Sequence, residues 1–435
     1  MAFRIGCGSW AVLAVLLSGV VQAAAPAPDP AVLAQVVEWR RDFHQHPELG
    51  NREVRTAGIV AAHLESLGLE VRTGVAHTGV VAYLRGARER PLVALRADMD
   101  ALPVTEEVDL PFASKQRGQF RGEEVGLMHA CGHDAHTAIL MGVASVLAAQ
   151  REQLQGSVLF VFQPAEEGPP EGEEGGAALM LKEGMFAAPR QPDAVVGLHV
   201  LSNLRVGTVG VRGGPLMAES DSFKIIVQGQ QTHGSRPWMG VDPILAAARI
   251  VDGLQSIASR RIDPTTSPVV VSVGAIKGGI RYNIIPDQVE MIGTVRSFDT
   301  ETRDAVYADI RRIAEHTASA HGASATVSFA QHTLVTRNDL ALTRQLRPSL
   351  EAVVGADKVK DMPLSTIAED FAYLAEAVPG FYFFVGATPA DQDPRRAPSN
   401  HSPRFYLDEG SLEIGLRSML QVTHDFLAQG RDAEN

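Results

Sequence analysis

Short apolar runs that alternate with helical segments constrain the fold of this chain more than any other feature. Each run is bounded by glycine, proline or charge, as buried strands are. The runs span residues 80–84, 92–95, 158–162 and 195–200. Segments with helical apolar spacing lie at residues 31–43, 56–67 and 136–149. This alternation predicts an α/β fold with a central, mostly parallel sheet covered by helices.

The pattern changes at the breaker cluster Gly213-Gly214-Pro215. From residue 220 the predicted order is β-α-β-β-α-β, a compact two-layer α+β unit of roughly 100 residues. The first pattern then resumes and ends in a helix over residues 409–427. Because 435 residues exceed one ordinary core, we expect two domains. The predicted bounds are 31–213 and 332–430 for the two parts of a catalytic domain, and 214–331 for an inserted lid, whose paired hinges would permit closure.

The first residues predict a signal peptide over residues 1–23. Arg4 is the only charge before an apolar run over residues 10–21, and Val21-Gln22-Ala23 follows with small residues. The run is too short to span a bilayer, and cleavage is expected after Ala23 or Ala25. The alternative is a buried N-terminal helix. The signal predicts export, to a periplasm or to the outside of the cell.

Charge and cysteine content narrow the classes of partner. A formal net charge of −12 argues against nucleic acid binding, and no second apolar run is long enough to cross a membrane. Removing the signal leaves Cys131 as the single cysteine, so no internal disulfide can form. A lone thiol in an oxidising compartment is explained by metal ligation or, alternatively, by a redox-sensing role.

Polar clusters follow the predicted strands, where open α/β sheets place their sites. Asp98 and Asp100 come directly after one strand and can support a metal site, although a solvated loop is the alternative. Cys131 and His133 suit a borderline-soft cation such as zinc. Asp134, beside them, is placed to act as a helix N-cap.

Three further positions complete the candidate site. Adjacent Glu166 and Glu167 repel unless a cation or proton separates their roles, so one is expected to bind metal and the other to take a proton from activated water. His199 and His401 lie at a strand end and in a late loop, where a lone histidine is often structural. Together the dispersed donors suffice for two metals if one of them bridges.

The order of these motifs resembles the M20 metallopeptidases over essentially the whole mature chain. It is most similar to their amidohydrolase branch, which includes hippurate hydrolases and auxin–amino-acid conjugate hydrolases. The motifs that carry the resemblance are Arg40 to Gly50, Asp98 to Pro103, His129 to Asp134, Gln163 to Gly168, Gly197-Leu198-His199 and Asn400-His401-Ser402.

The resemblance implies a dinuclear amidohydrolase that cleaves N-acyl or N-aroyl amino acids, or short peptides with a free carboxylate. Two divalent ions, zinc, manganese, cobalt or nickel, would be bound by Cys131, His133, Glu167, His199 and His401. Glu166 would be the general base, and Asp100 would orient a metal ligand. His233 would reach the site from the lid, supplied in dimeric relatives by the neighbouring subunit. Asn283 would hold the substrate carboxylate, with Arg281 a further candidate by its charge alone.

The chain departs from the family pattern in two places. Residues 169–175 form an acidic insertion near the site, and Trp238 stands where many relatives have a second histidine. Two rivals with the same chemistry remain, a dipeptidase and an N-acetyl-diaminopimelate deacetylase. A third rival, from another class, is a catalytically silent exported protein that binds a metal or ligand.

Overall fold

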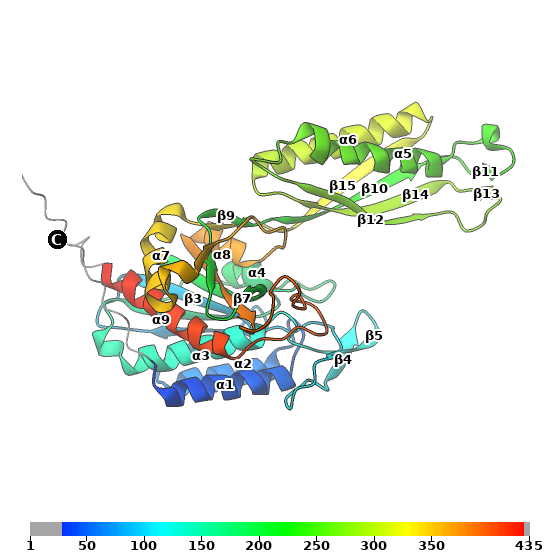
Figure 1. Ribbon diagram of the computed structural model, residues 1–435. Helices are drawn as coiled ribbons and strands as arrows, with labels where there is room; N and C mark the ends of the chain where they lie inside the picture. Colours follow the sequence, from blue (N-terminus) through cyan, green and yellow to red (C-terminus); the bar gives the residue numbers. More distant parts are fainter. Residues whose placement is uncertain (1–27, 430–435) are drawn as a thin grey trace, which may run out of the picture.

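The computed structural model describes residues 28–429, so the predicted signal peptide lies outside the described residues. Figure 1 shows two parts: a large α/β part at the lower left and a slender lid that extends from it. This architecture confirms the predicted fold class. Within residues 28–429, no helix is both long and apolar enough to cross a bilayer.

The large part is built on one eight-stranded sheet in the order β1-β2-β6-β3-β7-β18-β8-β17. The central strands β6, β3, β7 and β18 run parallel, whereas β1, β2 and β8 pair antiparallel to their inner neighbours. The strands are β1 (Glu70–Val75), β2 (Gly79–Leu84), β3 (Leu92–Asp98), β6 (Ser157–Gln163), β7 (Ala194–Arg205), β8 (Val209–Val211), β17 (Val359–Asp361) and β18 (Gly380–Thr388). Strands β3, β6 and β18 are buried along their whole length because helices cover both sheet faces.

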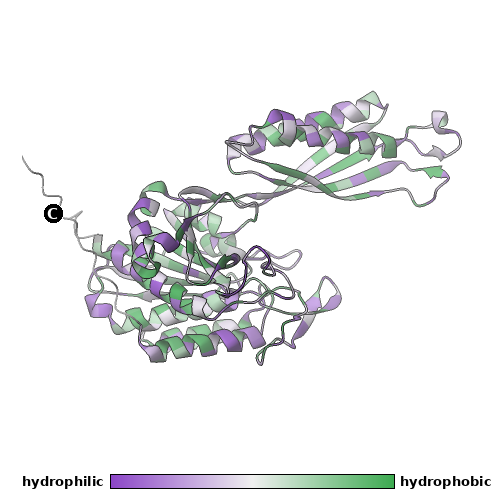
Figure 2. Ribbon diagram, in the orientation of Figure 1, coloured by the Kyte–Doolittle hydropathy of each residue, from purple (hydrophilic) through white to green (hydrophobic). Residues whose placement is uncertain are grey.

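Each face of the sheet has its own hydrophobic core. One core joins the strands to α1 (Pro30–Gln45), α2 (Val54–Ser66), α3 (His133–Ala149), α7 (Leu340–Val354) and α9 (Gly410–Gln429). The other joins them to the short helices α4 (Gly176–Lys182) and α8 (Phe371–Ala377). Figure 2 shows the apolar strands between helices whose outer faces are hydrophilic. The buried sheet therefore holds the strand ends rigidly, which a precise site requires.

The lid has a four-stranded antiparallel sheet in the order β12-β14-β10-β15 with two helices on one face. Its elements are β10 (Ser220–Gln228), α5 (Pro243–Ser256), β12 (Val270–Gly278), β14 (Gln288–Arg296), α6 (Thr300–Ala320) and β15 (Ser324–Thr333). The chain enters through β9 (Gly214–Met217) and leaves through β16 (Thr336–Asn338), and these two strands pair with each other. Entry and exit therefore lie side by side, as an inserted unit requires.

Some local features differ from the sequence prediction. Strand β1 was missed because it is mostly exposed and lacks an apolar run. The short strands β8 and β17 were missed, as was the hairpin of β4 (Arg117–Phe120) and β5 (Glu123–Gly126). Helix α3 begins at His133, so the N-cap is Gly132 and the prediction that Asp134 caps it is wrong. The Asp134 carboxylate instead accepts a hydrogen bond from Arg40 Nε at 3.0 Å.

Candidate active site

Six of the predicted residues converge where the central strands end. We call Cys131, His133, Glu166, Glu167, His199 and His401 the donor cluster. Cys131 Sγ lies 3.3 Å from His199 Nε2 and 3.2 Å from His401 Nε2. His401 Nε2 lies 2.9 Å from Glu167 Oε1. Residues up to 270 positions apart in the sequence are therefore in contact.

The donor atoms fall into three overlapping groups, in each of which all atoms lie within 4.8 Å of one another. The groups are Cys131, His133 and His199; Cys131, Glu167 and His401; and His133, Glu166 and Glu167. Cys131, His133 and Glu167 each belong to two of these groups. The overlap is what two neighbouring cation positions with shared ligands require.

Asp100 orients two members of the cluster. His133 Nδ1 lies 2.8 Å from the Asp100 backbone oxygen and 3.2 Å from its Oδ1, so this nitrogen donates to Asp100 and Nε2 faces Glu166. Asp100 Oδ2 accepts a hydrogen bond from the Glu167 backbone N–H at 3.0 Å. This placement matches the orienting role that the resemblance implies for Asp100.

Unusual backbone conformations bring the donors together. Gly132, between Cys131 and His133, has φ 96°, and a Cβ there would lie 2.3 Å from Val200 Cγ2. Only glycine therefore lets this loop approach the strand that carries His199. Ala165 and His401 also have positive φ, 51° and 70°, a strained state in non-glycine residues that is concentrated at functional sites.

Asn400 joins the His401 loop to the sheet. Its Nδ2 donates to the backbone oxygens of Cys131 at 3.0 Å and Val200 at 3.1 Å, and its Oδ1 accepts from Ser202 N–H at 3.1 Å. Asn400 stands in one of the family motifs, although its motif alone predicted no role for it. Its position next to His401 in the sequence was the one indication that it could support the site.

Burial and charge set the protonation of the cluster. Burial, followed by the charge of Glu167, raises the pKa of the Cys131 thiol well above its usual range. Burial and the nearby Glu369 likewise raise the pKa of Glu166 well above its usual range. Burial and His136 lower the pKa of His199. A divalent cation that binds here would displace protons from these buried acidic groups.

The residues present fit divalent metal ions. His133 Nε2 is buried, has no hydrogen-bond partner and lies 3.9 Å from Glu166 Oε2. A buried nitrogen without a partner is costly unless something binds it. Thiolate, imidazole and carboxylate are also the donors that zinc and similar ions prefer.

His136, although close, is not available as a ligand. Its Nδ1 lies 2.6 Å from Asp98 Oδ1, and its Nε2 accepts a hydrogen bond from Val200 N–H at 2.9 Å. Both ring nitrogens are therefore engaged. Asp98 in turn pairs with Arg96 at 2.7 Å, so this group is a buried hydrogen-bond network.

A buried arginine beneath the cluster was not foreseen as functional. Arg96 bonds to Gln163 Oε1 at 2.9 Å, Glu369 Oε1 at 2.9 Å and Asp370 Oδ1 at 3.1 Å, besides Asp98. Glu369 and Asp370 have carboxylate oxygens within 4.8 Å of Glu166. Both residues are distant in sequence from the other site residues and belong to none of the family motifs. Their one signal in the sequence is that two adjacent acidic residues precede a helix.

The lid residues are not part of the cluster in a single chain. His233 lies in β11 (Thr232–His233), and Asn283 and Arg281 directly precede its partner β13 (Ile284–Ile285). Figure 1 shows β11 and β13 at the outer end of the lid, away from the large sheet. The predicted roles of these three residues stay predictions.

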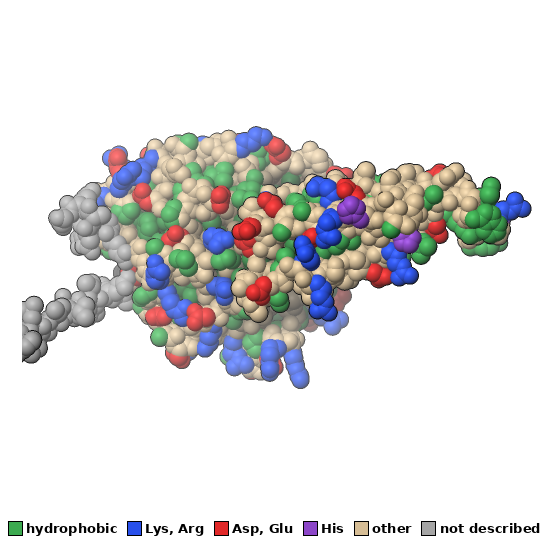
Figure 3. Space-filling view, turned by 90° about the horizontal axis from the view of Figure 1, so that it is seen from above, with side chains coloured by type: hydrophobic (Ala, Val, Ile, Leu, Met, Phe, Trp, Pro, Cys, Tyr) green, Lys and Arg blue, Asp and Glu red, His purple; other side chains and the backbone are tan. Residues whose placement is uncertain are grey.

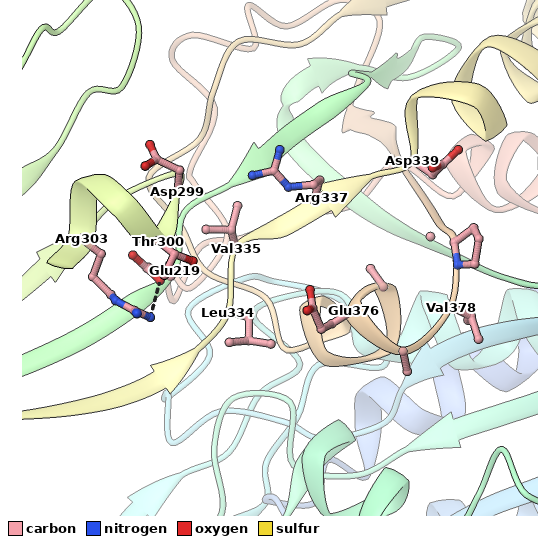
Figure 4. Close-up of a pocket in the computed structure, with 14 residues that line it drawn as sticks. Glu219, Asp299, Thr300, Arg303, Leu334, Val335, Arg337, Asp339, Glu376 and Val378 are labelled. Atoms are coloured by element: carbon pink, nitrogen blue, oxygen red, sulfur yellow. Dashed lines mark hydrogen bonds and ion pairs between the residues drawn. The ribbon is translucent and has the colours of Figure 1, made fainter.

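A hollow lies at the hinge between the large part and the lid. It has a volume of 440 Å³ and is lined from both parts of the chain, for example by Arg303 of α6 and Arg337 of β16. Figure 4 shows Arg303 paired with Glu219, a contact of 3.5 Å. No member of the donor cluster lines this hollow, so it is separate from the candidate site.

Comparison with known proteins agrees with this geometry. The family model "Peptidase family M20/M25/M40" matches residues 94–425. The chain belongs to this family. The family match and the relatives described below make the chain a hydrolase that acts on carbon–nitrogen bonds. The resemblance deduced from the motifs is confirmed.

Among relatives, the chain is 39% identical to an N-acetyl-L-cysteine deacetylase of Bacillus subtilis, over 87% of this chain and 85% of the relative. It is also 39% identical to the IAA-amino acid hydrolase ILR1-like 4 of Arabidopsis thaliana, over 87% and 83%. A solved structure of Bacillus subtilis YXEP, titled a dinuclear metal binding peptidase from the M20 family, superposes with a TM-score of 0.76 at 35% identity, over 92% of this chain and 99% of that one.

We predict that Arg96→Met destabilises the protein by about 3 kcal/mol or more, because it leaves several buried carboxylates without a counter-charge. Urea unfolding of the mature protein measures this effect. The matched control is Arg85→Met, which breaks only the exposed Arg85–Glu89 pair and should change the free energy of unfolding by less than about 0.5 kcal/mol. Equal effects of the two variants would show that the Arg96 network contributes no special stability.

Proposed function

We propose that the protein is a dinuclear-metal amidohydrolase of N-acyl amino acids that carry a free carboxylate. The observation that carries the proposal is the donor cluster itself, with five metal-capable side chains and Glu166 beside them. Cys131, His133, Glu167, His199 and His401 would hold two divalent ions. The names of the relatives, a deacetylase and an amino-acid-conjugate hydrolase, support an N-acyl amino acid as the substrate class.

In the proposed reaction, bound divalent ions supply Lewis acidity, which makes a water acidic and polarises the acyl carbonyl. The Glu166 carboxylate takes one proton from the attacking water, and the hydroxyl oxygen bonds to the acyl carbon. Glu166 then gives the proton to the amide nitrogen as the carbon–nitrogen bond breaks, so that acid and amine leave. Glu166 is placed for this exchange because its Oε2 lies 3.9 Å from His133 Nε2, within the group of donors that would hold the ions.

The lid supplies the remaining groups from a second copy of the chain. His233 would donate a hydrogen bond to the oxygen that becomes negative during attack, and Asn283 and Arg281 would hold the substrate carboxylate. In one chain these residues lie at the outer end of the lid, so a homodimer that exchanges lid ends accounts for them. Association of this kind is isologous, with each copy completing the other.

Specific observations argue against two of the alternative functions. A silent binding protein needs no general base, yet Glu166 stands beside an intact donor set. A redox-sensing Cys131 needs an accessible thiol of low pKa, whereas this thiol is buried and its pKa is raised. A dipeptidase and an N-acetyl-diaminopimelate deacetylase use the same groups and are separated only by their substrates.

We predict that the mature protein cleaves a panel of N-acyl amino acids only when loaded with zinc, manganese, cobalt or nickel. Glu166→Ala should lower kcat by about a hundredfold or more, because it removes the general base, while metal analysis still finds about two ions per chain. Dipeptides and N-acetyl-diaminopimelate belong in the same panel. Full activity of Glu166→Ala, or no amide cleaved with any metal, would contradict the proposal.

We predict that two inactive variants complement each other. Glu166→Ala and His233→Ala should each be about a hundredfold less active than wild type, the latter through loss of an oxyanion donor. When the two are co-refolded in equal amounts, one site of each mixed dimer has both residues, so about a quarter of the wild-type activity should return. Continued inactivity of the mixture would place His233 and Glu166 in the same chain's site, and an unimpaired His233→Ala variant would place His233 outside the site.

We also propose that the chain is exported, on the strength of the apolar run and the small residues before Ala23. N-terminal sequencing of the protein from a fractionated native host should find a start directly after Ala23 or Ala25, in the periplasm or the medium. Intact Met1 in the cytoplasmic fraction would exclude this localisation.

A further inference from the structure

The base of the lid is hydrogen-bonded to a segment of the large part that leads to Glu166. We call residues 216–218 together with Thr336 the lid root. They belong to the paired strands β9 and β16 or directly follow them, and all are buried. Figure 3 shows the lid projecting from the large part. Because β9 and β16 are its two covalent connections, a movement of the lid relative to the large part acts on these residues.

The entry side of the lid root binds the backbone of residues 365–367. The ladder between β9 and β16 skips Leu216, which makes a β-bulge on the entry strand. The backbone oxygen of Leu216 instead accepts a hydrogen bond from Ser365 N–H at 3.0 Å. Ala218 N–H donates to the backbone oxygens of Ser365 at 2.9 Å and Ile367 at 3.1 Å. The entry strand therefore holds this segment at three hydrogen bonds.

The exit side of the lid root binds the same segment two residues later. Thr336 Oγ1 donates a hydrogen bond to the backbone oxygen of Glu369 at 3.1 Å, and both residues are buried. The two residues are 33 positions apart, so this bond is a tertiary link and not part of a local turn. The same oxygen accepts Ala372 N–H at 3.2 Å, where α8 begins. Both connecting strands thus fix the backbone that carries Glu369.

The side chain of Glu369 lies next to the proposed general base. Its Oε1 accepts a hydrogen bond from Arg96 Nη2 at 2.9 Å. Carboxylate oxygens of Glu369, Asp370 and Glu166 lie within 4.8 Å of one another. Since ionised carboxylates repel, the pair directs an ionised Glu166 away from itself and toward His133, whose Nε2 is 3.9 Å from Glu166 Oε2.

We infer that Thr336 and Glu369 are positioning residues that link the lid root to the orientation of the general base. The inference rests on the proposed function, because both residues would act on the reaction through Glu166. Thr336 fixes the backbone of Glu369, and the Glu369 carboxylate limits the directions that Glu166 can take. Neither residue belongs to the donor cluster, so their substitution displaces the base without removing a metal ligand.

Conservative variants of Thr336 test the link. Thr336→Val keeps the shape of the side chain and removes the donor. The metal-loaded variant should lose about tenfold in kcat while KM changes by less than about twofold, because the base is displaced and the substrate contacts are not. Thr336→Ser keeps the hydroxyl and should retain most of kcat. Metal analysis should find the same content in both variants as in wild type.

The matched control is Thr423→Val. Thr423 is equally buried, and its hydroxyl also donates to a backbone oxygen, that of Met419 at 2.7 Å within α9. This variant loses the same kind of hydrogen bond outside the lid root, so kcat and KM should both stay at the wild-type values.

A double-mutant cycle tests whether Thr336 acts through Glu369. Glu369→Gln keeps the size of the side chain and removes its charge, and it should lower kcat by about tenfold or more. Adding Thr336→Val to Glu369→Gln should then lower kcat by less than about twofold further, because residues that act as a unit are not additive.

Hydrogen exchange gives a measurement that needs no turnover. Thr336→Val should speed amide exchange by about threefold or more in the peptides that cover residues 365–371 and 163–168, because loss of the bond loosens both. Thr423→Val should leave exchange in these two peptides unchanged.

The outcomes separate this inference from the proposed function. Full activity of Thr336→Val, a Thr336→Ser variant as impaired as Thr336→Val, additive losses in the cycle, or unchanged exchange in the two peptides overturns the inference and leaves the amidohydrolase intact. Equal losses in Thr336→Val and Thr423→Val reduce the effect to general stability and also overturn it. No cleavage of any amide by the wild-type protein overturns the proposed function, and the positioning roles with it.

Discussion

The donor cluster depends on one buried cation, the guanidinium of Arg96. This side chain is fully buried and contacts Asp98, Gln163, Glu369 and Asp370. Burying an isolated charge is strongly unfavourable, so the guanidinium and its carboxylates are stable only together. Strand β3, strand β6 and the segment before α8 are consequently fixed against one another beneath the place where the donors meet.

Two chains of contacts lead from this arginine to the reacting groups. Asp98 continues to His136, whose Nε2 accepts the N–H of Val200, next to His199. Asp370 accepts hydrogen bonds from Gln163 Nε2 at 2.7 Å and from Ala177 N–H at 2.8 Å, on either side of the loop that carries Glu166 and Glu167. These contacts fix the loops that carry the donors to the ends of the strands. Catalysis requires such precise positioning of the reacting groups.

The sequence was sufficient for those parts of the fold and site that local patterns encode. The buried strands were found because they are continuous apolar runs, and the donors were found because thiol, imidazole and carboxylate groups follow these runs in a recognisable order. The Arg96 network was not predicted, because Glu369 lies 273 residues from Arg96 and no periodicity links them. The start of α3 was misplaced because Gly132, a left-handed residue selected by contact with Val200, is a tertiary requirement.

The division of the chain into a rigid part and a lid separates two physical demands. Metal ligands must be held within a fraction of an ångström. The sheet, covered by helices on both faces and crosslinked by the buried charged side chains around Arg96, can hold them in this way. Substrate selection instead needs side chains that contact the ligand and then release it. The outer end of the lid, which carries His233, is connected to the large part through the adjacent strands β9 and β16 and lies away from the sheet that carries Arg96. The reaction proposed for the donor cluster therefore depends on the large part of the chain, whereas the roles proposed for His233, Asn283 and Arg281 depend on the lid.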